Sequence, residues 1–141
     1  MAETKARIKL IEGIQMLGES GSGHTVVMDA APEMGGRNMG VRPMELLLIG
    51  MGGCTSIDVL NILRKGRHDV KDCDVSVSGK RADTEPKVYT DITVHFKITG
   101  TKIPEKAVQR AISLSEEKYC SASIMLGKTA QIHTSYEIIE A

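Results

Sequence analysis

The segment PMELLLIGMGGCTSIDVLNILRK, residues 43–65, is the long apolar segment around which we expect the rest of the chain to pack. Pro43 suits the first turn of a helix, and Gly66 directly after Arg64 and Lys65 is typical of a helix end. The pattern therefore predicts one helix about 34 Å long, at about 1.5 Å per residue. Its apolar residues occupy more than one face, so we expect the helix to be buried nearly all round.

Three glycines stand at the centre of this segment, beside a cysteine. Gly50, Gly52 and Gly53 each cost about 1 kcal/mol relative to Ala in a helix interior, so their clustering needs a compensating reason. Close approach of another backbone would provide one, because Gly has no Cβ. We therefore expect the thiol of Cys54 to lie at a tight helix crossing.

Composition and charge narrow the functional classes. The chain has 141 residues and no internal repeat, which predicts a single domain over residues 1–141. Its 18 basic and 18 acidic residues cancel, and it has no Trp, one Phe and three Tyr, so neither charge nor base stacking favours nucleic-acid binding. No signal peptide is predicted, because the N-terminus MAETKARIKL has no apolar run long enough for one, and residues 43–65 are too interrupted to span a membrane. We expect a cytoplasmic protein.

The remaining segments alternate between strand and helix patterns. Strands are expected at residues 5–11, 14–20, 24–30, 69–81, 87–100 and 129–139, and further helices at residues 104–120 and 121–126. This order predicts an α+β fold. A single sheet of six strands can cover only one face of the central helix, so the other face needs a partner surface, which a homodimer would supply.

The chain has three cysteines, which is an odd number, and they are widely spaced. This pattern argues against a secreted disulfide framework and against a CxxC pair. Cys73 falls on the apolar face of a predicted strand and is interpreted as a packing residue. Cys54 and Cys120 each stand among small residues, and on these grounds each could be an inert core cysteine or a reactive thiol. Cys120 lies at a helix break, where free N–H groups would lower the thiol pKa. Cys54 lies in mid-helix, so another cation would have to stabilise its thiolate.

These residues together resemble a known family. Pro43, Glu45, the leucine run, Gly52-Gly53-Cys54 and Asp58-Val59, with EKYCSAS around Cys120, are similar to the OsmC/Ohr family and most similar to its YhfA-like branch. The similarity extends over the whole chain, including the element order and the interval between the two cysteines. It implies a single OsmC-like domain whose six-stranded antiparallel sheet wraps the central helix. It also implies an intertwined homodimer with two sites at the subunit interface.

The resemblance implies a thiol-dependent peroxidase that reduces organic hydroperoxides. Cys54 would attack the peroxide and become a sulfenic acid, and Cys120 would resolve it as a disulfide. A dithiol reductant, such as a lipoylated protein, would then reset the pair, and neither a cofactor nor a metal is expected.

A Glu and an Arg complete the site in peroxidase members of the family, where the Glu directly follows the helix-opening Pro and orients the Arg over the thiolate. In this chain Met44 holds the Glu position, and Glu45 follows it, about 100° further round the helix. The available cations in the preceding Gly-rich loop are Arg37 and Arg42. The predicted site is therefore completed by Arg37, or alternatively Arg42, and by Glu45.

Two other functions stay open at this point. Because Met44 replaces the family Glu, the chain could be a non-catalytic dimer that binds a small apolar or thiol-bearing ligand in the same crevice. A metal site built from Cys54, Cys120 and a His of the partner subunit is a more distant alternative, since the four His residues show no metal-ligand spacing. Asp58 is expected to have a hydrogen-bond partner across the dimer, and a structural role is favoured over that of a general base.

Overall fold

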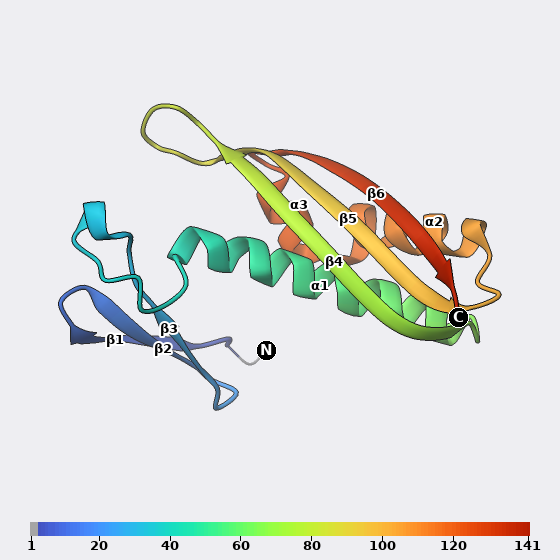
Figure 1. Ribbon diagram of the computed structural model, residues 1–141, viewed down its shortest axis with the longest axis horizontal. Helices are drawn as coiled ribbons and strands as arrows, with labels where there is room; N and C mark the ends of the chain where they lie inside the picture. The colour runs from blue at the N-terminus through green and yellow to red at the C-terminus, as the bar shows by residue number, and fades with distance from the viewer. Residues whose placement is uncertain (1–2) are drawn as a thin grey trace. The chain divides into compact units, whose positions relative to one another are not determined.

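The structure of the protein, a computed structural model, describes residues 3–141, which form two compact units (Figure 1). The first unit extends to Leu47, and the second spans Leu48–Ala141. Helix α1 (Pro43–Lys65) begins in the first unit and continues through the second. Both ends of α1 agree with the ends predicted from Pro43 and Gly66, and the predicted order of strands and helices is confirmed.

The first unit contains a three-stranded antiparallel meander. Strands β1 (Ala6–Glu12), β2 (Gln15–Ser20) and β3 (Thr25–Met28) lie in the order β1-β2-β3. Gly13 forms the first turn with a φ of 62°, a left-handed conformation that Gly adopts without steric cost. A short 3-10 turn, η1 (Pro32–Met34), follows within the Gly-rich loop.

A nearly buried carboxylate organises this loop. Asp29 accepts hydrogen bonds from the backbone N–H groups of Ala30 (2.8 Å), Met39 (3.0 Å) and Arg37 (3.2 Å). The bond from Ala30 is the main reason that the pKa of Asp29 lies below its usual range. The backbone of the loop that carries Arg37 is therefore folded around a negative charge.

The second unit contains the other sheet, in the order β4-β5-β6. Strand β4 (Asp69–Arg81) pairs antiparallel with β5 (Tyr89–Thr101), and β5 pairs parallel with β6 (Gln131–Glu140). Between β5 and β6 lie helix α2 (Glu105–Leu114), a π-helical turn η2 (Ser115–Tyr119) and helix α3 (Ser121–Leu126).

One six-stranded antiparallel sheet is therefore not confirmed, because the strands form two sheets of three and one pair is parallel. A parallel pair needs a long crossover connection, and α2, η2 and α3 provide it. Alternating apolar residues reveal a strand but not the direction of its neighbour.

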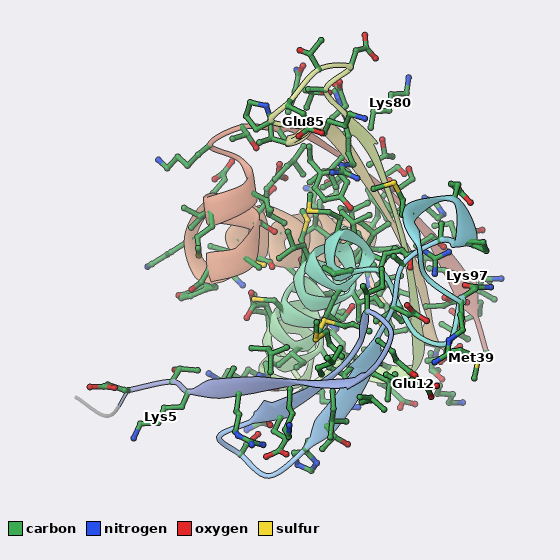
Figure 2. The ribbon with its side chains drawn as sticks, turned by 90° about the vertical axis from the view of Figure 1, so that its left-hand side faces the viewer. Lys5, Glu12, Met39, Lys80, Glu85 and Lys97 are labelled. Carbon is green, nitrogen blue, oxygen red and sulfur yellow. The ribbon has the colours of Figure 1, made fainter. Side chains whose placement is uncertain are left out.

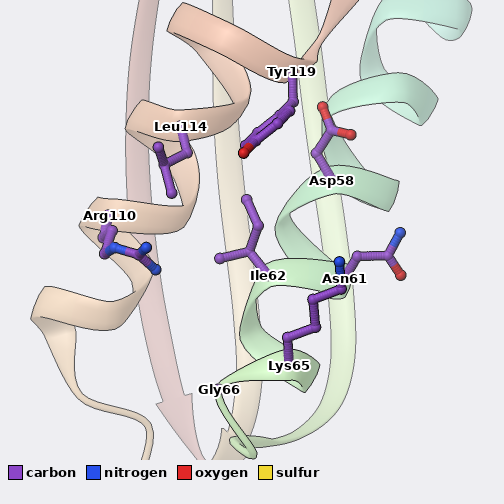
Figure 3. A pocket seen from close by; sticks show the side chains of 8 residues that line it. All are labelled: Asp58, Asn61, Ile62, Lys65, Gly66, Arg110, Leu114 and Tyr119. Carbon is purple, nitrogen blue, oxygen red and sulfur yellow. The ribbon is translucent and has the colours of Figure 1, made fainter.

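The core of the second unit lies between its sheet and its helices. Helices α1 and α2 run side by side along one face of the sheet (Figure 3). Alternate residues of β5 are buried on that face, whereas Lys97 points to the other side, away from α1 (Figure 2). The buried side chains of β5 are those of Tyr89, Ile92, Val94, Phe96 and Ile98. Burial of this apolar face is the main term that stabilises the second unit.

Helix α1 is buried on one side only within this chain. Its buried positions Met51, Thr55, Val59 and Leu63 recur every four residues and so form one stripe. Other faces are open, since Ile57 is 61% exposed. The expectation that α1 is buried nearly all round is therefore wrong for the single chain, because its own sheet and α2 cover only one side.

Only one of the three central glycines meets a neighbour in this chain. A Cβ added at Gly52 would lie 3.1 Å from Cγ2 of Val77 on β4, whereas one added at Gly50 or Gly53 would meet nothing within 4 Å. The predicted close approach is confirmed for Gly52. At Gly50 and Gly53 the described residues show no such approach.

By length and composition, α1 is the one helix in the described residues that could cross a membrane, although the core helix of a soluble protein meets the same criterion.

Candidate active site

The structure brings Cys54 and Cys120 together from different elements. Cys54 lies in the middle of α1, and Cys120 directly precedes α3. Strands β4 and β5 and helix α2 lie between them in the sequence. The two Sγ atoms and a carboxylate oxygen of Asp58 all lie within 4.8 Å of one another. Asp58 follows Cys54 by one helical turn, so both side chains project from the same face of α1. Both thiols are free, and Cys54 is the more exposed of the two.

An irregular turn positions Cys120. The backbone N–H of Cys120 donates to the carbonyl of Ser115 at 2.7 Å, which closes the π-helical turn η2. Such turns commonly mark functional sites, because they change the direction of the following residues. The Sγ atom of Cys120 accepts hydrogen bonds from the backbone N–H (3.3 Å) and the hydroxyl (3.0 Å) of Ser123, and thereby caps α3.

Burial decides the protonation of Cys120. Its side chain is fully buried, and this burial raises the pKa of the thiol above its usual value. The two hydrogen bonds from Ser123 act in the opposite direction, while Cys54 adds to the increase. The expectation that the helix break lowers the pKa of Cys120 is therefore wrong, because desolvation outweighs the two hydrogen bonds. Burial therefore favours the neutral form of the Cys120 thiol.

A chain of hydroxyl groups holds Asp58. The hydroxyl of Ser115 donates to Oδ2 of Asp58 at 3.0 Å, and the hydroxyl of Thr55 donates to Oγ of Ser115 at 2.7 Å. Both hydroxyl side chains are buried. The expected partner of Asp58 across a dimer is thus not required, since Ser115 of the same chain takes that place. Sequence reasoning misses Ser115 and Thr55, although Ser115 continues the helical spacing of Val108, Ala111 and Ile112 in the helix predicted at residues 104–120, which is a usable signal.

Arg37, Arg42 and Glu45 lie in the first unit, where each has contacts of its own. Nη2 of Arg37 forms an exposed ion pair with Oε2 of Glu12 at 3.2 Å, and Arg42 donates from Nη1 to Asn38 at 2.8 Å. Oε1 of Glu45 accepts a hydrogen bond from the backbone N–H of Arg42 at 2.8 Å. That bond satisfies an N–H group just before α1, as in a capping box, and gives Glu45 a structural role.

Glu45→Ala should lower the free energy of unfolding by about 1 kcal/mol, because the N–H of Arg42 loses its acceptor. Urea denaturation of the reduced protein measures this change. Glu45→Gln is the matched control, since its amide oxygen can accept the same bond, and it should retain most of the stability. Equal stability of the Ala variant and the natural protein would contradict this capping role.

A cavity of about 450 Å³ adjoins Asp58 between α1 and α2. Figure 3 shows Lys65 of α1 and Arg110 of α2 at its sides, with Tyr119 near Asp58. Asp58 thus belongs both to this cavity and to the thiol cluster. The cavity gives the acidic side of the cluster access to solvent.

Cys54 and Cys120 lie close enough to form a disulfide, and the carboxylate of Asp58 lies beside them. The chain is therefore a protein with a dithiol site on an α+β fold. Thiolate and carboxylate are also zinc ligands, so Cys54, Cys120 and Asp58 could hold a metal ion; among the residues described, this cluster includes no His.

The family model for OsmC-like protein matches residues 35–135. Protein YhfA of Escherichia coli (strain K12) is 45% identical, over 97% of this chain and 99% of its own length. The chain belongs to the OsmC-like family.

Solved structures share this fold. A hypothetical protein from Aquifex aeolicus VF5 is 32% identical, with a TM-score of 0.88, over 100% of this chain and 99% of its own. An organic hydroperoxide resistance protein OsmC from Legionella pneumophila is 16% identical, with a TM-score of 0.74, over 97% of this chain and 98% of its own. The second likeness concerns the fold alone. OsmC-like proteins are soluble, so we interpret α1 as a core helix.

Proposed function

We propose that the protein is a cytoplasmic, thiol-dependent peroxidase that reduces organic hydroperoxides. The observation that carries the proposal is the approach of two free thiols, Cys54 and Cys120, to within 4.8 Å. Membership of a family that includes an organic hydroperoxide resistance protein supports the same chemistry.

The two thiols differ in exposure, and this difference supports a separate role for each. Cys54 is partly exposed, so a peroxide can reach it, whereas Cys120 is fully buried. The Cys54 thiol loses its proton, its thiolate attacks the terminal oxygen of the peroxide, and the O–O bond breaks. The leaving alkoxide takes up one proton in place of the one that the thiol released and departs as an alcohol, and Cys54 becomes a sulfenic acid. Cys120 then displaces the oxygen and forms the disulfide. A dithiol reductant such as a lipoylated protein restores both thiols by exchange.

The test of this function is a count of thiols. Reduced protein is mixed with cumene hydroperoxide, and free thiols are measured with time. Two of the three thiols per chain should be lost, together with one equivalent of peroxide, and a dithiol should recover them. If no thiols are lost, or if all three are lost at the same rate, the proposal fails. Roles for Arg37 and Glu45 beside the thiolate stay a prediction from the family resemblance.

We also propose a homodimer that covers the open side of α1. Ile57 on that side is 61% exposed, and Gly50 and Gly53 have room for close approach of a second molecule.

Gly53→Ala should weaken this dimer about tenfold or more, because a methyl group would block the approach of the partner backbone. Sedimentation over a range of protein concentrations measures the effect. In an isolated chain the same change should instead stabilise α1 by about 1 kcal/mol, since Ala is the better helix former. Gain of stability without loss of association would contradict the proposed interface.

A second candidate function, favoured by the cavity beside Asp58, is binding of a small ligand without turnover. The cavity, of about 450 Å³, has Lys65 and Arg110 at its sides. Native mass spectrometry of the purified protein would reveal a bound molecule. Slow consumption of peroxide together with a bound molecule would favour this function over the peroxidase.

A further inference from the structure

We propose that Asp58 is the proton-transfer group of the disulfide-forming step, an inference that rests on the peroxidase function proposed above. The geometry that points to it is the meeting of one carboxylate oxygen of Asp58 with the Sγ atoms of Cys54 and Cys120, all within 4.8 Å of one another. In the described part of the chain, this cluster holds two reacting thiols and a single further group that can accept a proton.

The resolving step needs a base, because the thiolate and not the thiol is the nucleophile. Cys120 is fully buried, and burial favours its neutral form. Besides Cys54, the described groups bonded to its sulfur are the N–H and the hydroxyl of Ser123, and both donate toward the sulfur. They stabilise a thiolate once it exists, but they do not remove the proton. Asp58 is the acceptor within reach after a small rotation or through one water.

The step balances without any external acid or base. Asp58 takes the proton from the Cys120 thiol, and the resulting thiolate attacks Sγ of the Cys54 sulfenic acid. The new bond joins the two sulfurs, and the S–O bond of Cys54 breaks. The leaving oxygen takes the proton from Asp58 and departs as water, so Asp58 ends as a carboxylate. The oxidant is the hydroperoxide consumed in the preceding step.

The surroundings of Asp58 suit this role. Ser115, itself bonded by Thr55, donates to one carboxylate oxygen and so fixes the orientation of the group. The carboxylate also reaches the cavity, which gives it exchange with solvent. Apart from Asp58 itself, the titratable groups that line that cavity are Lys65 from α1, Arg110 from α2 and Tyr119 from η2 (Figure 3).

Asp58→Asn tests the proposal, because the amide oxygen can still accept the bond from Ser115 while the base is lost. Reduced protein is mixed rapidly with cumene hydroperoxide, and the sulfenic acid and the disulfide are followed separately. The sulfenic acid should form at close to the natural rate. The disulfide should form about tenfold to hundredfold more slowly, so that the sulfenic acid accumulates. The control is Ser115→Ala, which removes the hydrogen bond but keeps the carboxylate, and the disulfide step should slow far less.

A pH profile separates proton transfer from a structural defect. In Asp58→Asn the disulfide step should recover as the pH rises, because hydroxide then ionises Cys120; a distorted site would not recover. If the variant does not fold, the natural protein is compared in light and heavy water, where the disulfide step should be slower in heavy water.

The outcomes distinguish this inference from the function beneath it. Disulfide formation at the natural rate in Asp58→Asn, or the same rate in both waters, overturns the role of Asp58 and leaves the peroxidase standing. If the natural protein forms neither sulfenic acid nor disulfide, the peroxidase itself fails, and the role of Asp58 falls with it.

Discussion

Cys54→Ser should reduce the consumption of organic hydroperoxide by about 10³-fold or more, because the reaction loses its nucleophile. Cys120→Ser should behave differently. It should consume one equivalent of peroxide per chain rapidly and then stall, because the sulfenic acid of Cys54 has no partner thiol in the chain with which to condense. Excess peroxide should then carry Cys54 on to the sulfinic acid. Steady-state assays with a dithiol reductant and mass spectrometry of the oxidised variants measure both effects.

Cys73→Ser is the matched control for both variants. Cys73 lies on β4, where burial, followed by the charges of Asp72 and Asp74, raises the pKa of its thiol. A thiol held neutral in this way is a poor nucleophile, so its loss should leave turnover within about twofold of the natural protein. Comparable loss of turnover in Cys73→Ser and Cys54→Ser would contradict the assignment of Cys54 as the reacting residue.

The sequence predicts those parts of the fold that depend on local residues. Pro43 and Gly66 mark both ends of α1, and the predicted strand at residues 69–81 agrees with β4. The direction of β6 and the separation into two sheets depend instead on how the crossover packs, which no local pattern records. The sequence also overestimates how much of α1 is buried within one chain. An apolar pattern predicts that a face is covered, but it does not say whether the same chain or a second molecule covers it.

The site is less accessible from the sequence than the fold is. The spacing of Cys54 and Cys120 alone does not show whether they are core residues or reactive thiols. Their assignment to one site comes from the resemblance to a family. The direction of the pKa shift of Cys120 was wrong because burial of a side chain cannot be read from a helix break. The contact between Ser115 and Asp58 joins α1 to the turn after α2, so it exists only once both have packed on the sheet.

Oxidation of the natural protein should raise its stability by about 4 kcal/mol, because a disulfide between Cys54 and Cys120 closes a long loop and restricts the unfolded chain. For a chain of this length that corresponds to an increase in melting temperature of about 13 °C. The gain assumes that the two sulfurs, already within 4.8 Å, can approach to bonding distance without distorting α1 or the turn before Cys120.

Calorimetry of the reduced and oxidised forms at one protein concentration measures this gain, and the fixed concentration matters because association also changes the melting temperature. Cys73→Ser should retain the increase, and Cys120→Ser should lose it. The melting temperature of the oxidised protein could instead be unchanged or lower. The disulfide would then destabilise the native state by at least as much free energy as it gains by restricting the unfolded chain. In that case the two thiols would be near neighbours that the fold does not hold ready for bonding, and the exchange with a dithiol reductant would start from a strained, easily reduced disulfide.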